Sequence, residues 1–181
     1  MTETATDRPT SPSVVFADSD YVGLFRRFVI VAVDGLVVGL MWPLLAWLWY
    51  RVIEPVGEPY DQLMWSWIGF IYLYLAILKS TRVRTLGLWI TGSRVVDHRG
   101  KAPSFVRMTF RLLLWLLGPV NPIVDLFWLS SDRHRQTVRD KFAGTYVVRR
   151  YAVPVGQGKR KAAYYNLMGA TVIFWEIQPE E

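Results

Sequence analysis

Two long runs of apolar residues dominate the chain, at 28–50 and 63–78, and a third run at 104–131 is interrupted. The first run holds 23 residues and a single charge, Asp34. A helix rising about 1.5 Å per residue would cover roughly 34 Å there, enough for a hydrocarbon core of about 30 Å. The second run is shorter, but tryptophans near its start and Lys79 at its end can extend it to the interfaces. We therefore expect two transmembrane helices.

The third run breaks at 118–122, where Gly-Pro-Val-Asn-Pro separates two apolar stretches. Basic residues flank it on both sides: seven Lys or Arg against one acid at 79–107, and nine against two at 132–161. The loop at 51–61 is acidic instead. Because basic loops stay in the cytoplasm, we expect both flanks and the N-terminus to lie inside. A re-entrant pair of short helices satisfies this rule, and a third full span remains the alternative.

Two β-branched runs outside these helices, at 89–96 and 144–150, are typical of strands, and a glycine-containing turn follows the first. We expect them to pair in a small cytoplasmic β-sheet. The predicted fold class is therefore mainly α and integral to the membrane. It has two transmembrane helices, a broken (re-entrant or third) membrane helical segment, and this small sheet.

The two ends of the chain differ from this membrane domain. Residues 1–20 are polar and rich in Ser, Thr and Pro, so we expect a disordered N-terminal tail. The membrane domain would then cover 21–150, and 151–181 would form a C-terminal extension. Within that extension, the pattern at 171–175 fits either a strand or an element at the membrane interface.

The amino-acid composition of the chain excludes several kinds of protein function. Apolar residues make up 52% of the chain, and nine tryptophans fit the interfacial anchors of a membrane protein. The lack of Cys excludes disulfides, thiolate metal sites and cysteine catalysis. With two His on separate basic segments and no familiar catalytic motif, we expect no enzyme, no metal and no cofactor. The net charge of +6 fits a bilayer with anionic headgroups, and no base-stacking platform points to nucleic acid.

Asp34 is the principal candidate for function. A carboxylate near the middle of a membrane helix costs about 2.5–3.5 kcal/mol to insert, and such residues tend to mark ion or proton pathways. Arg27 lies seven residues earlier on the same helix face, but about 10 Å away along the axis. Asp34 should therefore find another partner, with Arg107, Arg111 or a wet cavity as the candidates. A buried ion pair that only fixes helix packing is the structural alternative.

Two further aspartates complete the candidate set. Asp125 follows Arg111 by 14 residues and would either face it across the predicted helical hairpin or lie hydrated at the membrane edge. Asp140 is expected to tie its basic loop to the small sheet or to Arg27. The predicted ion or proton pathway, or buried ion-pair set, is therefore Arg27, Asp34, Arg111, Asp125 and Asp140.

Three motifs in this order resemble those of the RDD family of bacterial membrane proteins. Arg27 and Asp34 fit its Arg-x6-Asp pattern in the first helix. The stretch at 85–100 is similar to a second family segment, and the run at 135–145 looks like its closing motif, with Asp140 as the second aspartate. The resemblance covers about residues 21–150. It implies a multi-pass protein of the bacterial cytoplasmic (inner) membrane, and cation/proton antiport has been suggested for some members.

Two function classes follow. In the first, the chain is a small cation/proton exchanger acting through Asp34, and its pathway would form between the protomers of a homo-oligomer. In the second, it is a non-catalytic accessory or scaffolding subunit whose terminal segments dock partner membrane proteins. The buried Asp34 and the break at 118–122 favour the first class. The polar N-terminal tail and the C-terminal extension favour the second.

Overall fold

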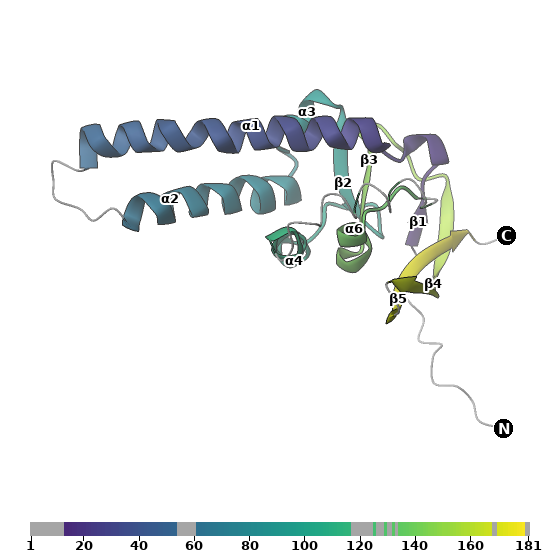
Figure 1. Cartoon of the computed structure of the whole chain (residues 1–181). Coiled ribbons are helices and arrows are strands. Elements are labelled where there is room, and N and C mark those ends of the chain that lie inside the picture. The colour runs from purple at the N-terminus through teal and green to yellow at the C-terminus, as the bar shows by residue number, and fades with distance from the viewer. Residues whose placement is uncertain are drawn as a thin grey trace, which may run out of the picture.

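The computed structural model describes residues 13–53, 61–116, 134–167 and 170–179, together with the single positions 125, 129 and 132. Its two longest helices form a hairpin that projects from a mixed α/β part, which we call the head (Figure 1). The head carries both ends of the chain that the structure describes, so the terminal segments meet the base of the hairpin rather than its tip.

The helical hairpin consists of the two apolar runs. Helix α1, Leu24–Leu48, continues into a π-helical turn, η2, at Trp49–Ile53. Helix α2, Asp61–Tyr72, continues into a second π-helical turn, η4, at Leu73–Leu78. The stretches Leu24–Val52, with 29 residues, and Asp61–Leu78, with 18, are both long and apolar enough to cross a membrane. Only 11% and 17% of their most apolar parts are buried within the chain, which is unlike the core helix of a soluble protein.

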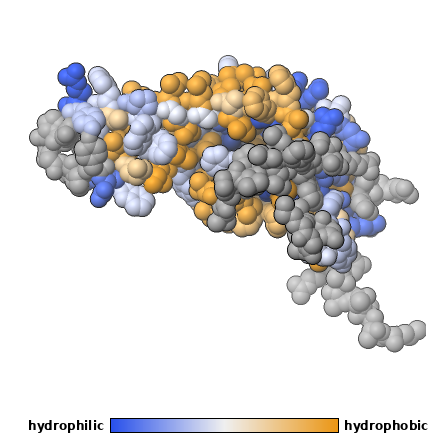
Figure 2. All heavy atoms as spheres, in the orientation of Figure 1, coloured by the Kyte–Doolittle hydropathy of each residue, from blue (hydrophilic) through white to orange (hydrophobic). Residues whose placement is uncertain are grey.

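The two helices run antiparallel. The Trp67 indole N–H donates to the Val38 carbonyl at 3.4 Å, and one helical turn further along α1 the Trp67 ring packs edge-on against Trp42. Toward the start of α1, the Tyr74 hydroxyl reaches Asp34. As the α1 residue number falls, the α2 number rises. The end of the second helix therefore lies beside the first half of α1. Figure 2 shows that apolar residues cover much of the outer surface of the helical hairpin.

The head contains the predicted small sheet. Strand β2, Ser93–Asp97, pairs antiparallel with β3, Thr145–Arg149, in the register Ser93↔Arg149 to Asp97↔Thr145. The predicted pairing of these two runs is confirmed. Short helices surround the sheet: α3 at Leu86–Ile90, α4 at Phe105–Leu116 and α6 at Val138–Ala143. A core joins α1 to the head, formed by Val22, Ile30, Leu88, Val95, Met108 and Val147.

A second, three-stranded sheet was not expected. Strand β1, Ser13–Val15, pairs with β4, Gly156–Leu167, and β4 forms a hairpin with β5, Ala170–Pro179. All pairings are antiparallel. The run at 171–175 is therefore a strand.

The prediction of disorder is wrong over residues 13–20, where β1 is followed by a 3-10 turn, η1, at Asp18–Asp20. The physical reason is that this segment has partners far along the chain. The Val14 N–H donates to the His98 carbonyl at 2.9 Å, and the Val15 carbonyl accepts from Val155 at 2.8 Å. The Phe16 ring is 3% exposed in a core with Tyr21 and Tyr146. Residues 1–12 lie outside the described residues.

The broken apolar run is described only in part. Its first half is α4, which contacts both η4 and α6. The Tyr72 and Thr109 hydroxyls lie 3.0 Å apart and join α4 to the helical hairpin. The predicted break at 118–122, and with it the choice between re-entry and a third span, lies outside the described residues.

Candidate functional site

Asp34 is held by four hydrogen-bond donors. The residue is 3% exposed. Its Oδ2 lies 2.9 Å from the Lys79 Nζ and accepts from the Thr85 hydroxyl at 3.0 Å. Its Oδ1 accepts from the Tyr74 hydroxyl at 3.1 Å and from the Gly87 N–H at 2.9 Å. Two carboxylate oxygens offer about four lone-pair sites, so this set satisfies the carboxylate completely.

The start of α3 supplies part of this contact with Asp34. The first N–H groups of a helix have no partner inside it. Here the Gly87 N–H donates to Asp34, and the Leu86 N–H donates to the Tyr74 hydroxyl at 3.0 Å. A Cβ at position 87 would lie 2.6 Å from the Ile30 carbonyl oxygen and 2.8 Å from the Asp34 Oδ1. Only glycine allows α3 to pack this closely on α1.

Neither of the two arginines expected as partners of Asp34 pairs with it. Arg111 pairs with Asp140, and Arg107 lies beside Asp97 and His98. Lys79 pairs with it instead, because the antiparallel hairpin returns the end of the second helix to the depth of Asp34. Lys79 was visible as the cation that ends the second apolar run, and antiparallel pairing of the two runs would have placed it there. Burial lowers the pKa of Lys79, although the negative charge of Asp34 opposes that shift.

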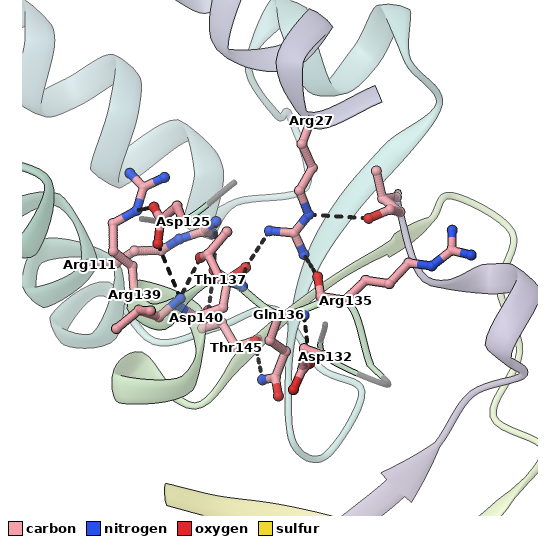
Figure 3. A network of polar contacts seen from close by, with 12 residues as sticks. Arg27, Arg111, Asp125, Asp132, Arg135, Gln136, Thr137, Arg139, Asp140 and Thr145 are labelled. Atoms are coloured by element: carbon pink, nitrogen blue, oxygen red, sulfur yellow. Dashed lines mark hydrogen bonds and ion pairs between the residues drawn. The ribbon is translucent and has the colours of Figure 1, made fainter. Parts of the chain in front are cut away.

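A second cluster surrounds Asp140, whose side chain is fully buried. The Arg27 guanidinium pairs with Oδ2, and the Arg111 Nη2 lies 2.7 Å from Oδ1 (Figure 3). Arg27 also donates to the carbonyls of Val22, at 3.2 Å, and Arg135, at 2.6 Å. One carboxylate thus links α1, α4 and the segment leading into α6.

Asp140 also organises its own helix. It forms a capping box with Thr137: the Thr137 hydroxyl accepts from the Asp140 N–H at 3.2 Å, and the Asp140 carboxylate accepts from the Thr137 N–H at 3.3 Å. The Thr145 hydroxyl at the start of β3 donates to Oδ1 at 3.3 Å. Asp140 therefore contacts both groups expected of it, Arg27 and the small sheet. Burial acts to raise the pKa of Asp140, but the charges of Arg111 and Arg27 outweigh it and hold the pKa well below its ordinary value.

Asp125 differs from what the sequence led us to expect. It is 3% exposed, so it is not hydrated at a membrane edge. Its ion-pair partner is Arg139 on α6 rather than Arg111, and its Oδ1 accepts from the Val138 N–H at 3.1 Å. Burial raises the pKa of Asp125, and the Arg139 charge opposes that shift. Chain separation alone could not choose between two arginines that both lie close to this carboxylate (Figure 3).

The five candidate residues thus fall into two separate groups. Asp34 lies with Lys79 at the base of the helical hairpin. Arg27, near the start of α1, pairs with Asp140 of the head, as does Arg111, and Asp125 lies beside them. Four residues of these groups were not expected from the sequence: Lys79, Tyr74, Thr85 and Arg139. Within the described part of the chain, no group of three or more His, Cys, Asp or Glu side chains could hold a metal ion.

Comparison with known protein families gives one match. A family model described as "RDD family" matches residues 21–144, which is well over half of the chain. Searches of the curated proteins and of the solved structures each found no match. The matched segment contains both clusters, whereas β1, β4 and β5 lie outside it.

Proposed function

The chain belongs to the RDD family, and from that premise we propose that it is a membrane protein that exchanges a small monovalent cation for a proton at Asp34. Family membership and two helices able to cross a bilayer suggest a membrane protein. One observation supports the proposed activity most strongly. The buried carboxylate of Asp34, in the first of these helices, pairs with Lys79, and Lys79 also lines an open cavity.

The burial of Asp34 supports this role. It lies ten residues into α1 and pairs with Lys79, which directly follows the second apolar helix, so it lies where the helical hairpin meets the head. An ionisable residue buried in a membrane segment is costly to insert and usually marks a pathway for ions or protons. The cavity at the base of the hairpin has a volume of about 440 Å³ and brings solvent to the Lys79 ammonium, whose side chain is 18% exposed.

The ion pair itself provides the coupling. The Lys79 ammonium occupies the position on the Asp34 Oδ2 that a free cation would take. A monovalent cation replaces it without a net change in charge only if Lys79 gives up its proton to water. One cation then binds for each proton released, and the reverse step returns the lysine to the carboxylate. The lowered pKa of Lys79 assists that proton release.

The neighbouring oxygens would suit a hard cation. When the lysine is neutral, the carboxylate of Asp34 and the hydroxyl oxygens of Thr85 and Tyr74 form an all-oxygen set, which alkali and alkaline-earth cations prefer over softer ligands. Two helices enclose little volume, so we place the remaining pathway between protomers of a homo-oligomer in the cytoplasmic membrane, with the N-terminus inside.

The test measures dissipation of a pH gradient in inverted membrane vesicles when Na⁺ or K⁺ is added. The variants are Asp34→Asn and the double change Asp34→Asn with Lys79→Gln, and the control is the exposed Asp18→Asn. We expect exchange in the wild type and the control and none in the two Asp34 variants. The double variant leaves no buried charge unpaired, and a Tm close to that of the wild type would show that its loss of exchange is not a loss of folding. Absence of exchange in the wild type at good expression would exclude the proposal.

A specific observation favours a second candidate, an accessory subunit. The sheet formed by β1, β4 and β5 lies outside the family match, and it exposes large apolar side chains at Tyr164, Ile173 and Trp175. Such side chains would fit a partner membrane protein. Chemical cross-linking in intact membranes, comparing wild type with Tyr164→Ser/Trp175→Ser, tests this. A cross-linked partner that the variant loses, in a chain without exchange activity, would favour the accessory function.

A further inference from the structure

A cationic cavity lies where the second helix ends and the head begins. Its volume of about 440 Å³ falls in the range typical of small-molecule sites. The lining comes from the end of the helical hairpin, the segment that follows it, β2 and the end of β3. Its charged members are Lys79, Arg82, Arg84, Arg94 and Arg150.

No carboxylate lines this cavity among the residues that the structure describes. Lys79 has its counter-charge in Asp34, which leaves four arginines without a carboxylate among the described residues that line the cavity. The Arg94 Nη2 is anchored on the Ala152 carbonyl at 2.7 Å. The pKa of Arg84 is lowered, first by burial and then by the charges of Arg150 and Arg94, so these guanidinium groups repel one another.

Two further features mark Arg84 as constrained. Its backbone is in the left-handed region, with φ of 67°, which residues other than glycine adopt only when the surroundings enforce it. Its Nη1 and the Arg94 Nε are buried and have no hydrogen-bond partner within the described part of the chain. Buried guanidinium donors without a partner are costly, which adds to the cost of holding these arginines together at the cavity.

We propose that this cavity binds a phosphate group, carried either by the headgroup of an anionic phospholipid or by a free phosphate. The planar guanidinium fork presents paired N–H donors that match the oxygens of a phosphate, and phosphate binding would relieve the repulsion between the arginines. Lys79 lines the same cavity, but the phosphate site rests on the arginines and not on Asp34, so different variants test the two proposals.

The surroundings favour the phospholipid as the source. Val83 stands between two of the lining arginines and is 71% exposed, and Tyr151 lines the cavity and is 82% exposed. Further exposed apolar side chains lie on α3, at Leu86, Trp89 and Ile90. A lipid with its phosphate on the arginines could place its acyl chains against such side chains, whereas a free phosphate would make no use of them. Basic pockets at the cytoplasmic end of membrane helices are a recurrent way of binding lipid headgroups.

The test uses the purified full-length chain in dodecyl maltoside micelles. The probes are phosphatidylglycerol, phosphatidylcholine and inorganic phosphate, and the readouts are the shift in apparent Tm and the bound lipid counted by native mass spectrometry. The variant Arg84→Gln/Arg150→Gln removes two charges from the cavity. The matched control, Arg26→Gln/Arg149→Gln, removes two exposed charges outside it. The single variant Arg82→Gln, at an exposed lining position, provides an independent test if the double variant folds poorly.

We expect phosphatidylglycerol to raise the Tm of the wild type and the control, and to bind the cavity variants at least tenfold more weakly. Stabilisation by inorganic phosphate alone, lost in the cavity variants, would support the site and identify free phosphate as its ligand. Equal stabilisation by phosphatidylcholine, an undiminished response of the cavity variants, or no response to either anion would overturn the proposal.

Discussion

Replacing Asp140 by asparagine tests whether one carboxylate holds α1 onto the head. Asparagine has nearly the same shape, and its side-chain oxygen can still accept from the Thr137 N–H in the capping box of α6. It would leave the Arg27 and Arg111 guanidinium groups without a counter-charge, and their side chains are only 9% and 15% exposed, so water cannot replace it. Breaking a buried ion pair by removing one partner costs about 3–5 kcal/mol. For a chain of this size that corresponds to a Tm lower by about 6–20 °C.

The measurement is the apparent Tm of the detergent-solubilised protein at neutral pH, with the exposed Asp18→Asn as the control for loss of a negative charge. A decrease of less than about 3 °C for Asp140→Asn, or an equal decrease in the control, would refute the reasoning. The difference between wild type and variant should also depend on pH. Because the folded pKa of Asp140 lies below the ordinary 3.8, its contribution is complete at pH values above 3.8 and is lost as the pH falls through the folded pKa.

Three further changes test other parts of the account by the same Tm measurement. Gly87→Ala should separate α3 from α1 and destabilise the fold by about 2 kcal/mol or more. Gly69→Ala is the control, because nothing lies within 4 Å of its added Cβ, and it should be neutral or slightly stabilising. Equal effects of the two changes would contradict the close packing of α3 on α1. Asp34→Asn should destabilise the folded protein by about 3–5 kcal/mol, and adding Lys79→Gln should restore most of that loss. If the two losses of stability were additive, the two residues would not act as a pair. Phe16→Ala should cost about 3–5 kcal/mol, and a negligible effect would mean that residues 13–20 do not contribute to the core.

Hydropathy was sufficient to locate the two long helices, and β-branched runs located one small sheet, because both signals are local in the sequence. A long run of apolar residues indicates a helix able to cross a membrane, whatever other segments that helix contacts. The runs that became β2 and β3 carry β-branched residues next to glycine turns, which is a strong strand signal. The capping box of α6 was also readable, since Thr137 and Asp140 have the required three-residue spacing.

What the sequence could not reveal depends on contacts between distant segments. Asp34 meets Lys79 because the hairpin returns at that depth, and no spacing within α1 encodes this. Strand β4 begins as Gly-Gln-Gly-Lys-Arg-Lys, which is typical of an exposed basic turn, and it becomes a strand because β1 and β5 pair with its two edges. Residues 13–20 were expected to be disordered for the same reason, since their partners lie at the other end of the chain.

The most direct test of the central claim is proton release on cation binding. Purified protein in weakly buffered detergent solution is titrated with NaCl or KCl, with choline chloride as the control for ionic strength, while a pH electrode records released protons. The account predicts that Na⁺ or K⁺, but not choline, releases up to one proton per chain, and that Asp34→Asn/Lys79→Gln releases none. No release from the wild type at saturating cation, or equal release from the double variant, would contradict an exchange of cation for proton at Asp34.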